Sequence, residues 1–216
     1  MLPSEKEFDK SLAPAAADVL SSLAGIEDLK YFTLVGGSAL SIYLNHRISE
    51  DLDFFTWIEK LESARIDSLL NSISRTHTVK IINSYLEGLD ISIDQVKVTF
   101  FANGWNKLKE RERLLKNSYI GRLELLTAMK TNTLSLRAKF RDYYDLYTIT
   151  KKAYDINKVL EIALQYIPGM TKKIFVMQLV YTEDIDDENI GHLKPESDVS
   201  LDDIRKYFEK EIKSIL

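Results

Sequence analysis

The stretch Tyr31–Thr56, which reads YFTLVGGSALSIYLNHRISEDLDFFT, constrains the fold of this chain more than any other segment. An apolar run ends at the glycine turn Gly36–Ser38, a segment of helical character follows, and a second apolar run begins with Asp51–Asp53. The first run is apolar without alternation, which is typical of a strand inside a sheet. The pattern therefore predicts a strand, a glycine turn, a short helix and a second strand, the beginning of an α/β fold.

The second run carries two acids, Asp51 and Asp53. Because successive side chains of a strand point to opposite faces, these two carboxylates are expected on the same face. Such a pair is a candidate site for a hard divalent cation, Mg²⁺ or Mn²⁺. A pair of exposed acids on an edge strand is the alternative. The apolar neighbours favour metal binding, since two like charges on a mostly buried strand are costly without a cation.

The glycine turn is a candidate phosphate site. Gly36, Gly37 and Ser38 would supply backbone N–H groups and a hydroxyl at a helix N-terminus, where the helix macrodipole favours phosphate. The sequence therefore predicts that one element binds a metal ion and that the other binds phosphate.

The remaining chain divides into a β-rich part and a helical part. A helix is expected over Leu61–Ile73, and three β-rich runs within Val79–Phe101 predict an antiparallel meander. Asn103 and the glycine after it form a turn signal, and apolar residues downstream recur near helical spacing. We therefore expect an α/β core, a mixed sheet with flanking helices, over residues 1–103. A C-terminal helical domain over residues 104–216 would close over the site.

Composition excludes several classes of protein. The 216 residues include no cysteine, which excludes disulfides, thiolate zinc sites and cysteine nucleophiles. No stretch approaches the roughly 18 uninterrupted apolar residues that a membrane span needs. The charged N-terminus, MLPSEKEFDK, does not resemble a signal peptide. A cytoplasmic protein with no membrane partner is expected.

Charge is unevenly distributed along the chain. The formal net charge is −4, yet Asn106–Lys152 holds twelve Lys or Arg residues against five Asp or Glu, a surplus of seven positive charges. A basic segment of this kind could bind RNA phosphates. Solvated helix faces are often equally rich in charge, so both interpretations stay open.

Twelve residues separate Ser38 from Asp51, and this arrangement resembles the signature of the DNA polymerase β-like nucleotidyltransferases. The fuller string, with Arg47, Ser49 and Glu50 before DLDFF, looks more specifically like the AbiEii/AbiGii toxin family. The resemblance implies transfer of a nucleoside monophosphate (NMP) from a nucleoside triphosphate (NTP) to an acceptor hydroxyl. It also implies that Gly36, Gly37 and Ser38 hold the β- and γ-phosphates of the NTP, with Arg47 among the NTP-binding residues. It also implies a toxin of a toxin–antitoxin or abortive-infection system, with tRNA as a plausible acceptor and a cognate antitoxin as partner.

A second segment, Thr127–Tyr147, reads TAMKTNTLSLRAKFRDYYDLY and resembles the later motif of the same family. Matched position by position, Lys130 and Asp142 take catalytic positions, and Lys130 and Arg137 take NTP-binding ones. A continuous helix would place Lys130 and Arg137 on one face, suited to a triphosphate, because arginine binds phosphate bidentately and lysine acts as a point charge. Asp142 would orient a basic side chain or the acceptor hydroxyl. Structural ion pairs of Arg137, Asp142 and Asp145 within the helical domain are the alternative.

The chain departs from the superfamily pattern at Thr99, where many relatives place a third carboxylate on a later strand. Asp90 or Asp94 could substitute from neighbouring strands, or the cation could keep more of its waters. Thr99 also leaves room for a catalytically inert nucleotide-binding module. A nucleotidyltransferase that acts on a protein or a small molecule is the remaining alternative.

Overall fold

The computed structural model describes residues 8, 10–102, 110–186 and 190–215, and the chain forms two compact units, Met1–Arg122 and Leu123–Leu216. The boundary expected between residues 103 and 104 lies within residues 103–109, outside the described part. The first unit reaches Arg122 because a β-hairpin downstream of that point belongs to its sheet.

The first unit is built on a seven-stranded mixed sheet with the strand order β3-β4-β5-β2-β1-β7-β6. β2 runs antiparallel to β1 and parallel to β5, and β3, β4 and β5 form the expected antiparallel meander. The strands are β1 (Thr33–Val35), β2 (Leu52–Thr56), β3 (Val79–Tyr85), β4 (Gly88–Ile93), β5 (Val96–Ala102), β6 (Arg111–Leu115) and β7 (Ser118–Gly121). The mixed sheet with flanking helices is confirmed, and the β6–β7 hairpin adds two strands to it.

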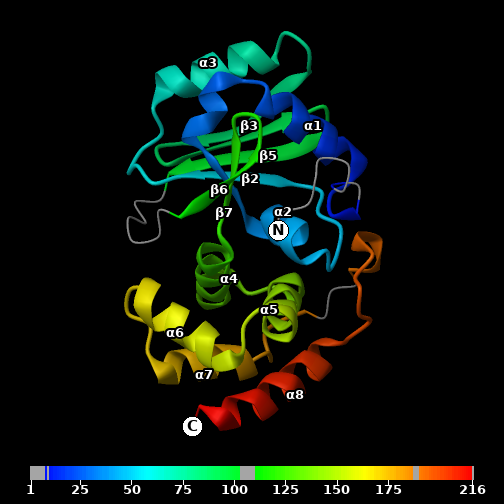
Figure 1. Cartoon of the computed structure of the whole chain (residues 1–216), viewed down its shortest axis with the longest axis vertical. Coiled ribbons are helices and arrows are strands. Elements are labelled where there is room, and N and C mark those ends of the chain that lie inside the picture. Colours follow the sequence, from blue (N-terminus) through cyan, green and yellow to red (C-terminus); the bar gives the residue numbers. More distant parts are fainter. Residues whose placement is uncertain (1–7, 9, 103–109, 187–189, 216) are drawn as a thin grey trace. The chain divides into compact units, whose positions relative to one another are not determined.

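Three α-helices belong to this unit: α1 (Pro14–Ala24), α2 (Gly36–Leu44) and α3 (Ser63–Ile73). Pro14 starts α1, where its missing N–H has no helical partner to lose. In the view of Figure 1, α3 lies above the sheet and α2 lies below β2. Phe54 of β2 stacks on Phe100 of β5 with ring centroids 5.3 Å apart, and both side chains are fully buried. The sheet core thus fixes β2, the strand that carries Asp53.

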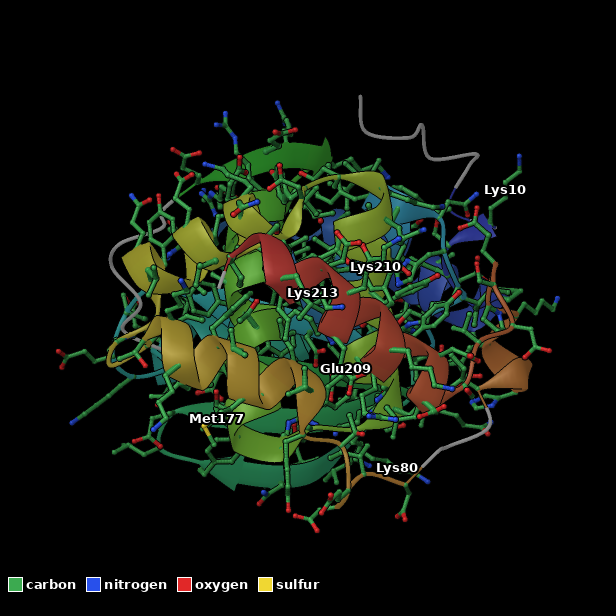
Figure 2. The ribbon with its side chains drawn as sticks, turned by 90° about the horizontal axis from the view of Figure 1, so that it is seen from below. Lys10, Lys80, Met177, Glu209, Lys210 and Lys213 are labelled. Carbon is green, nitrogen blue, oxygen red and sulfur yellow. The ribbon has the colours of Figure 1, made fainter. Side chains whose placement is uncertain are left out.

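The second unit is helical, with α4 (Leu123–Arg137), α5 (Phe140–Lys152), α6 (Ile156–Tyr166), α7 (Lys172–Val180) and α8 (Leu201–Glu211). The break between α4 and α5 means that Lys130 and Arg137 share one helix, whereas Asp142 lies in the first turn of the next. Figure 2 labels Met177, an exposed apolar residue of α7. Among the residues that the structure describes, no helix combines the length and apolar character needed to cross a membrane.

Candidate active site

The approach of Gly36 to Asp53 is the central feature of the site. Gly36 opens α2 with φ +71°, a conformation that glycine adopts readily, and a Cβ atom there would lie 2.5 Å from Oδ2 of Asp53. The carboxylate of Asp53 therefore lies directly against the N-terminal turn of α2. The expected proximity of an acid and a glycine-lined helix start is present within this unit.

Asp51 and Asp53 differ in their settings. Asp51 is exposed and immediately precedes β2, whereas Asp53 is half-buried on β2 between β1 and β5. Two carboxylates are a donor set that Mg²⁺ or Mn²⁺ accepts, and glycine at position 36 leaves the space that the Asp53 carboxylate occupies. These residues fit a divalent cation that keeps waters in its shell. Within the described ranges, no group of three or more His, Cys, Asp or Glu side chains is arranged to hold a metal ion.

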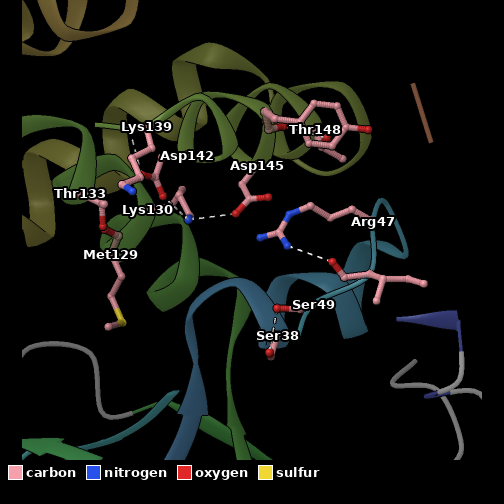
Figure 3. A network of polar contacts seen from close by, with 12 residues as sticks. Ser38, Arg47, Ser49, Met129, Lys130, Thr133, Lys139, Asp142, Asp145 and Thr148 are labelled. Atoms are coloured by element: carbon pink, nitrogen blue, oxygen red, sulfur yellow. Dashed lines mark hydrogen bonds and ion pairs between the residues drawn. The ribbon is translucent and has the colours of Figure 1, made fainter. Parts of the chain in front are cut away.

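Ser38 faces inward. Its side chain is buried, and its hydroxyl donates to the carbonyl oxygen of Asp51 and lies 2.9 Å from the Ser49 hydroxyl (Figure 3). This contact ties the start of α2 to the segment leading into β2. The hydroxyl thus positions Asp51 in this structure, and phosphate binding at the turn would use backbone N–H groups.

Arg47 lies against the second glycine of the turn. A Cβ atom at Gly37 would meet Nη2 of Arg47 at 2.5 Å, and the guanidinium donates to the carbonyl oxygen of Ile48 at 3.2 Å (Figure 3). The Arg47 side chain is 5% exposed. A permanent positive charge is therefore held beside the N-terminus of α2, where it complements an anion.

In the helical unit, Lys130 is bound by two acids of α5. Its Nζ lies 2.8 Å from Oδ1 of Asp142 and 2.9 Å from Oδ2 of Asp145, and all three side chains are at least nine-tenths buried (Figure 3). Asp142 also accepts a hydrogen bond from the backbone N–H of Lys139 and so caps α5. The alternative of structural ion pairs is therefore realised for both acids, and Asp142 does orient a basic side chain. Arg137 is exposed at the end of α4.

Thr99 and Asp90 form a pair that the sequence had left open. Asp53 of β2 is in register with Thr99 of β5, and Thr99 is in register with Asp90 of β4. The Thr99 hydroxyl donates to Oδ1 of Asp90 at 2.8 Å. Asp94, the other candidate, lies in the turn after β4, where its carboxylate contacts His77 and the Thr78 backbone. The strand register therefore selects Asp90 over Asp94 as the acid beside Thr99, and this register cannot be read from the sequence.

Known proteins share both the sequence pattern and the fold. Residues 18–108 match the family model described as "Nucleotidyl transferase AbiEii toxin, Type IV TA system". An uncharacterized protein of Aquifex aeolicus is 26% identical over 213 residues, which covers 96% of this chain and 98% of that protein. This relative spans nearly the same length.

Two solved structures share the fold. MenT4, a nucleotidyltransferase toxin from Mycobacterium tuberculosis, superposes with a TM-score of 0.60 at 15% identity, covering 95% of this chain and 88% of its own. ANT(2″)-Ia, solved in complex with adenylyl-2″-tobramycin, superposes with a TM-score of 0.52 at 10% identity, covering 70% of this chain and 97% of its own. The family match over residues 18–108, which contain the glycine turn and Asp51–Asp53, shows that this part of the chain is similar to the AbiEii nucleotidyltransferase toxins, and the two solved structures show a nucleotidyltransferase-like fold.

Proposed function

We propose that this protein transfers an NMP group from an NTP to a hydroxyl of RNA, with tRNA as the first candidate acceptor, in a reaction that depends on Mg²⁺ or Mn²⁺. The acceptor oxygen forms a bond to the α-phosphorus and releases its proton to solvent. The bond from that phosphorus to the oxygen bridging to the β-phosphate breaks, and pyrophosphate leaves with its electron pair. The observation that carries the proposal is the approach of the Asp53 carboxylate to Gly36 at the start of α2. It brings a cation ligand and an anion-binding helix terminus together.

Each residue of the first unit has a distinct task in this proposal. Asp51 and Asp53 hold the cation, which neutralises charge on the phosphates when bound. The backbone N–H groups at Gly36 and Gly37 bind the β- and γ-phosphates, supported by the helix dipole. Ser38 holds the backbone of Asp51 in place, and Arg47 adds a positive charge beside the turn. Catalysis then comes from positioning and electrostatic stabilisation.

The proposal gives residues of the helical unit a part as well. Arg137 is exposed and has the planar fork that binds phosphate oxygens bidentately. Lys130 contributes its charge while Asp142 and Asp145 fix its ammonium group. The buried ion pairs equally support a structural role for Lys130, Asp142 and Asp145.

RNA is favoured as acceptor by the basic segment, although part of its charge is already used. Arg111 donates to the carbonyl oxygen of Lys30 and Arg122 pairs with Glu110. Arg137 and Lys151 are exposed and keep positive charge at the surface. The family description adds a toxin role, so we propose a cognate antitoxin as the protein partner.

A small-molecule hydroxyl is the second candidate acceptor, favoured by the fold shared with ANT(2″)-Ia and its adenylylated tobramycin. The test is incubation with each α-³²P-labelled NTP, Mg²⁺ and total tRNA, or with an aminoglycoside or a protein lysate. An Asp51→Asn/Asp53→Asn variant is the control. Label that depends on the two acids and is removed by RNase supports the RNA acceptor. Label that survives RNase supports another acceptor, and no label above the control with any acceptor contradicts the proposal.

A further inference from the structure

Three polar side chains lie in one row across the strands β2, β5 and β4. The row is Asp53, Thr99 and Asp90, each in register with the next. The neighbours of Asp90 on β4, Leu89 and Ile91, are buried, whereas Asp90 itself is half-exposed. Because side chains alternate along a strand, Asp90 faces away from the apolar core that these neighbours fill. The row thus extends the acidic face of β2 onto a neighbouring part of the sheet.

The spacing of the row decides how Asp90 can act. Adjacent strands lie about 4.8 Å apart, so Asp53 and Asp90 are separated by about 10 Å between their backbones. This agrees with the finding that the described residues contain no cluster of three metal-ligating side chains. A gap of this size is suited to a water molecule, and Mg²⁺ keeps several waters in its shell.

Thr99 fixes the direction of the Asp90 carboxylate. A hydroxyl carries one proton, and that of Thr99 is donated to Oδ1 of Asp90 at 2.8 Å. Thr99, which stands on β5 where many relatives have the third carboxylate, therefore holds the carboxylate of Asp90 on the neighbouring strand β4. A carboxylate held in this way is preorganised to accept a hydrogen bond from a metal-bound water.

Tyr85 lies within reach of the charges of both Asp90 and Asp53. Its phenol ring crosses Gly88, where a Cβ atom would lie 2.1 Å from Cζ of the ring. Burial raises the pKa of Tyr85, and the negative charges of Asp90, Glu87 and Asp53 raise it further. Both acids of the row thus act on the same group.

We propose that Asp90, held by Thr99, is the third carboxylate of the cation site and binds a water of the ion's shell instead of the ion itself. The inference rests on the proposed function, since it requires a cation at Asp51 and Asp53. Asp90 is a positioning residue in this account. A cross-strand hydrogen bond that only stabilises the sheet is the competing role.

Mn²⁺ binding to the full chain, followed by electron paramagnetic resonance without any NTP, tests the inference apart from turnover. Asp90→Asn and Thr99→Val are compared with the wild type, with Asp53→Asn, and with Glu87→Gln as a charge-matched control. Glu87 is exposed in the same hairpin and lies outside the row. We expect Asp90→Asn to weaken Mn²⁺ binding about tenfold, as loss of an outer-shell partner does. Thr99→Val should weaken it in the same direction, and Glu87→Gln should match the wild type.

The exchange variant Asp90→Thr/Thr99→Asp moves the acid back to β5 and should bind Mn²⁺ more tightly than Asp90→Asn. Thermal unfolding of each variant confirms that a folded protein is being compared. Wild-type Mn²⁺ affinity in both Asp90→Asn and Thr99→Val, with binding lost in Asp53→Asn, overturns this inference and leaves the proposed function intact. Wild-type affinity in Asp53→Asn overturns the cation site of the proposed function itself.

Discussion

Oδ2 of Asp53 lies where a side chain at Gly36 would begin, 2.5 Å from the position of a Cβ atom at that glycine. The φ angle of +71° at Gly36 adds a second reason for glycine at this position. The contact fixes the carboxylate against the start of α2. A cation held by Asp53 would consequently lie beside the backbone N–H groups proposed to bind phosphate.

Gly36→Ala should therefore abolish Mn²⁺ binding and lower the free energy of unfolding. Alanine in a left-handed backbone conformation costs about 1–2 kcal/mol, and its methyl group would also displace the Asp53 carboxylate. Gly169→Ala is the matched control, because Gly169 has φ +75° and no atom within 4 Å of its Cβ position. Urea unfolding should show a loss in both variants, and Mn²⁺ titration a loss in Gly36→Ala alone. Equal Mn²⁺ affinity in the two variants would show that the contact does not shape the site.

Gly37→Ala should weaken NTP binding through Arg47. The new methyl group would lie 2.5 Å from Nη2 of Arg47, and a guanidinium at the end of a flexible side chain can move away. We expect KM for the NTP to rise, with a smaller change in kcat, because a charge is moved without removing a cation ligand. Arg47→Lys should raise KM similarly, since lysine cannot reproduce bidentate binding. Steady-state kinetics with pyrophosphate detection gives both constants, and an unchanged KM in both variants removes Arg47 from the NTP site.

Lys130→Met should destabilise the helical unit by about 3–5 kcal/mol, because Asp142 and Asp145 would be left as buried, uncompensated carboxylates. Lys158→Met is the control: Lys158 pairs with Glu161 at the surface of α6, and its loss should barely move the unfolding midpoint. Urea denaturation of both variants makes the comparison. Lys130→Arg should keep most of the stability, so a large fall in activity with normal stability in that variant would favour a direct role in NTP binding.

Tyr143 should make the helical unit sensitive to alkali. Burial, with a smaller effect of the Asp142 charge, raises the pKa of Tyr143 from the ordinary tyrosine value of about 10 to about 12. An unfolded tyrosine loses its proton first, so the stabilising contribution is complete below about pH 10 and is lost as the pH rises towards 12. Tyr143→Phe should be less stable at pH 8, since the hydroxyl lies 2.8 Å from the Gln178 carbonyl oxygen. Above pH 10, the urea midpoint should then fall less steeply with pH in Tyr143→Phe than in the wild type. Equal slopes in the two proteins would show that Tyr143 is not the group responsible for the alkaline loss of stability.

The elements near the site follow from the sequence because local signals agree there. A strand, a short helix and a second strand form in the predicted order. However, α2 already begins at Gly36, and β2 begins at Leu52, so Asp51 lies just outside the strand on which it was expected. The β6–β7 hairpin was missed because Arg111–Leu115 is rich in charge and reads as a solvated segment. Its place in the sheet depends on β7 pairing with β1, a partner far away in the sequence.

The polar contacts of the site were less predictable than its elements. The sequence marked Ser38 as a phosphate ligand, whereas the structure directs its hydroxyl to the carbonyl oxygen of Asp51. The sequence directed Lys130 to a triphosphate, whereas the break between α4 and α5 brings two acids of α5 to its ammonium group. The contacts of Ser38 and Lys130 depend on the path of the backbone between elements, which the spacing of residues in the sequence does not define.

The central claim is that Asp51 and Asp53 hold a divalent cation that helps the glycine turn of α2 bind a triphosphate. Calorimetric titration with a non-hydrolysable NTP analogue, with Mg²⁺ and then with EDTA, measures this directly in the wild type and in Asp53→Asn. We expect the wild type to bind the analogue at least about tenfold more tightly with Mg²⁺, which corresponds to about 1.4 kcal/mol. Asp53→Asn should lose that difference. Equal affinity of the wild type with and without Mg²⁺ would contradict the claim and indicate an inert nucleotide-binding module.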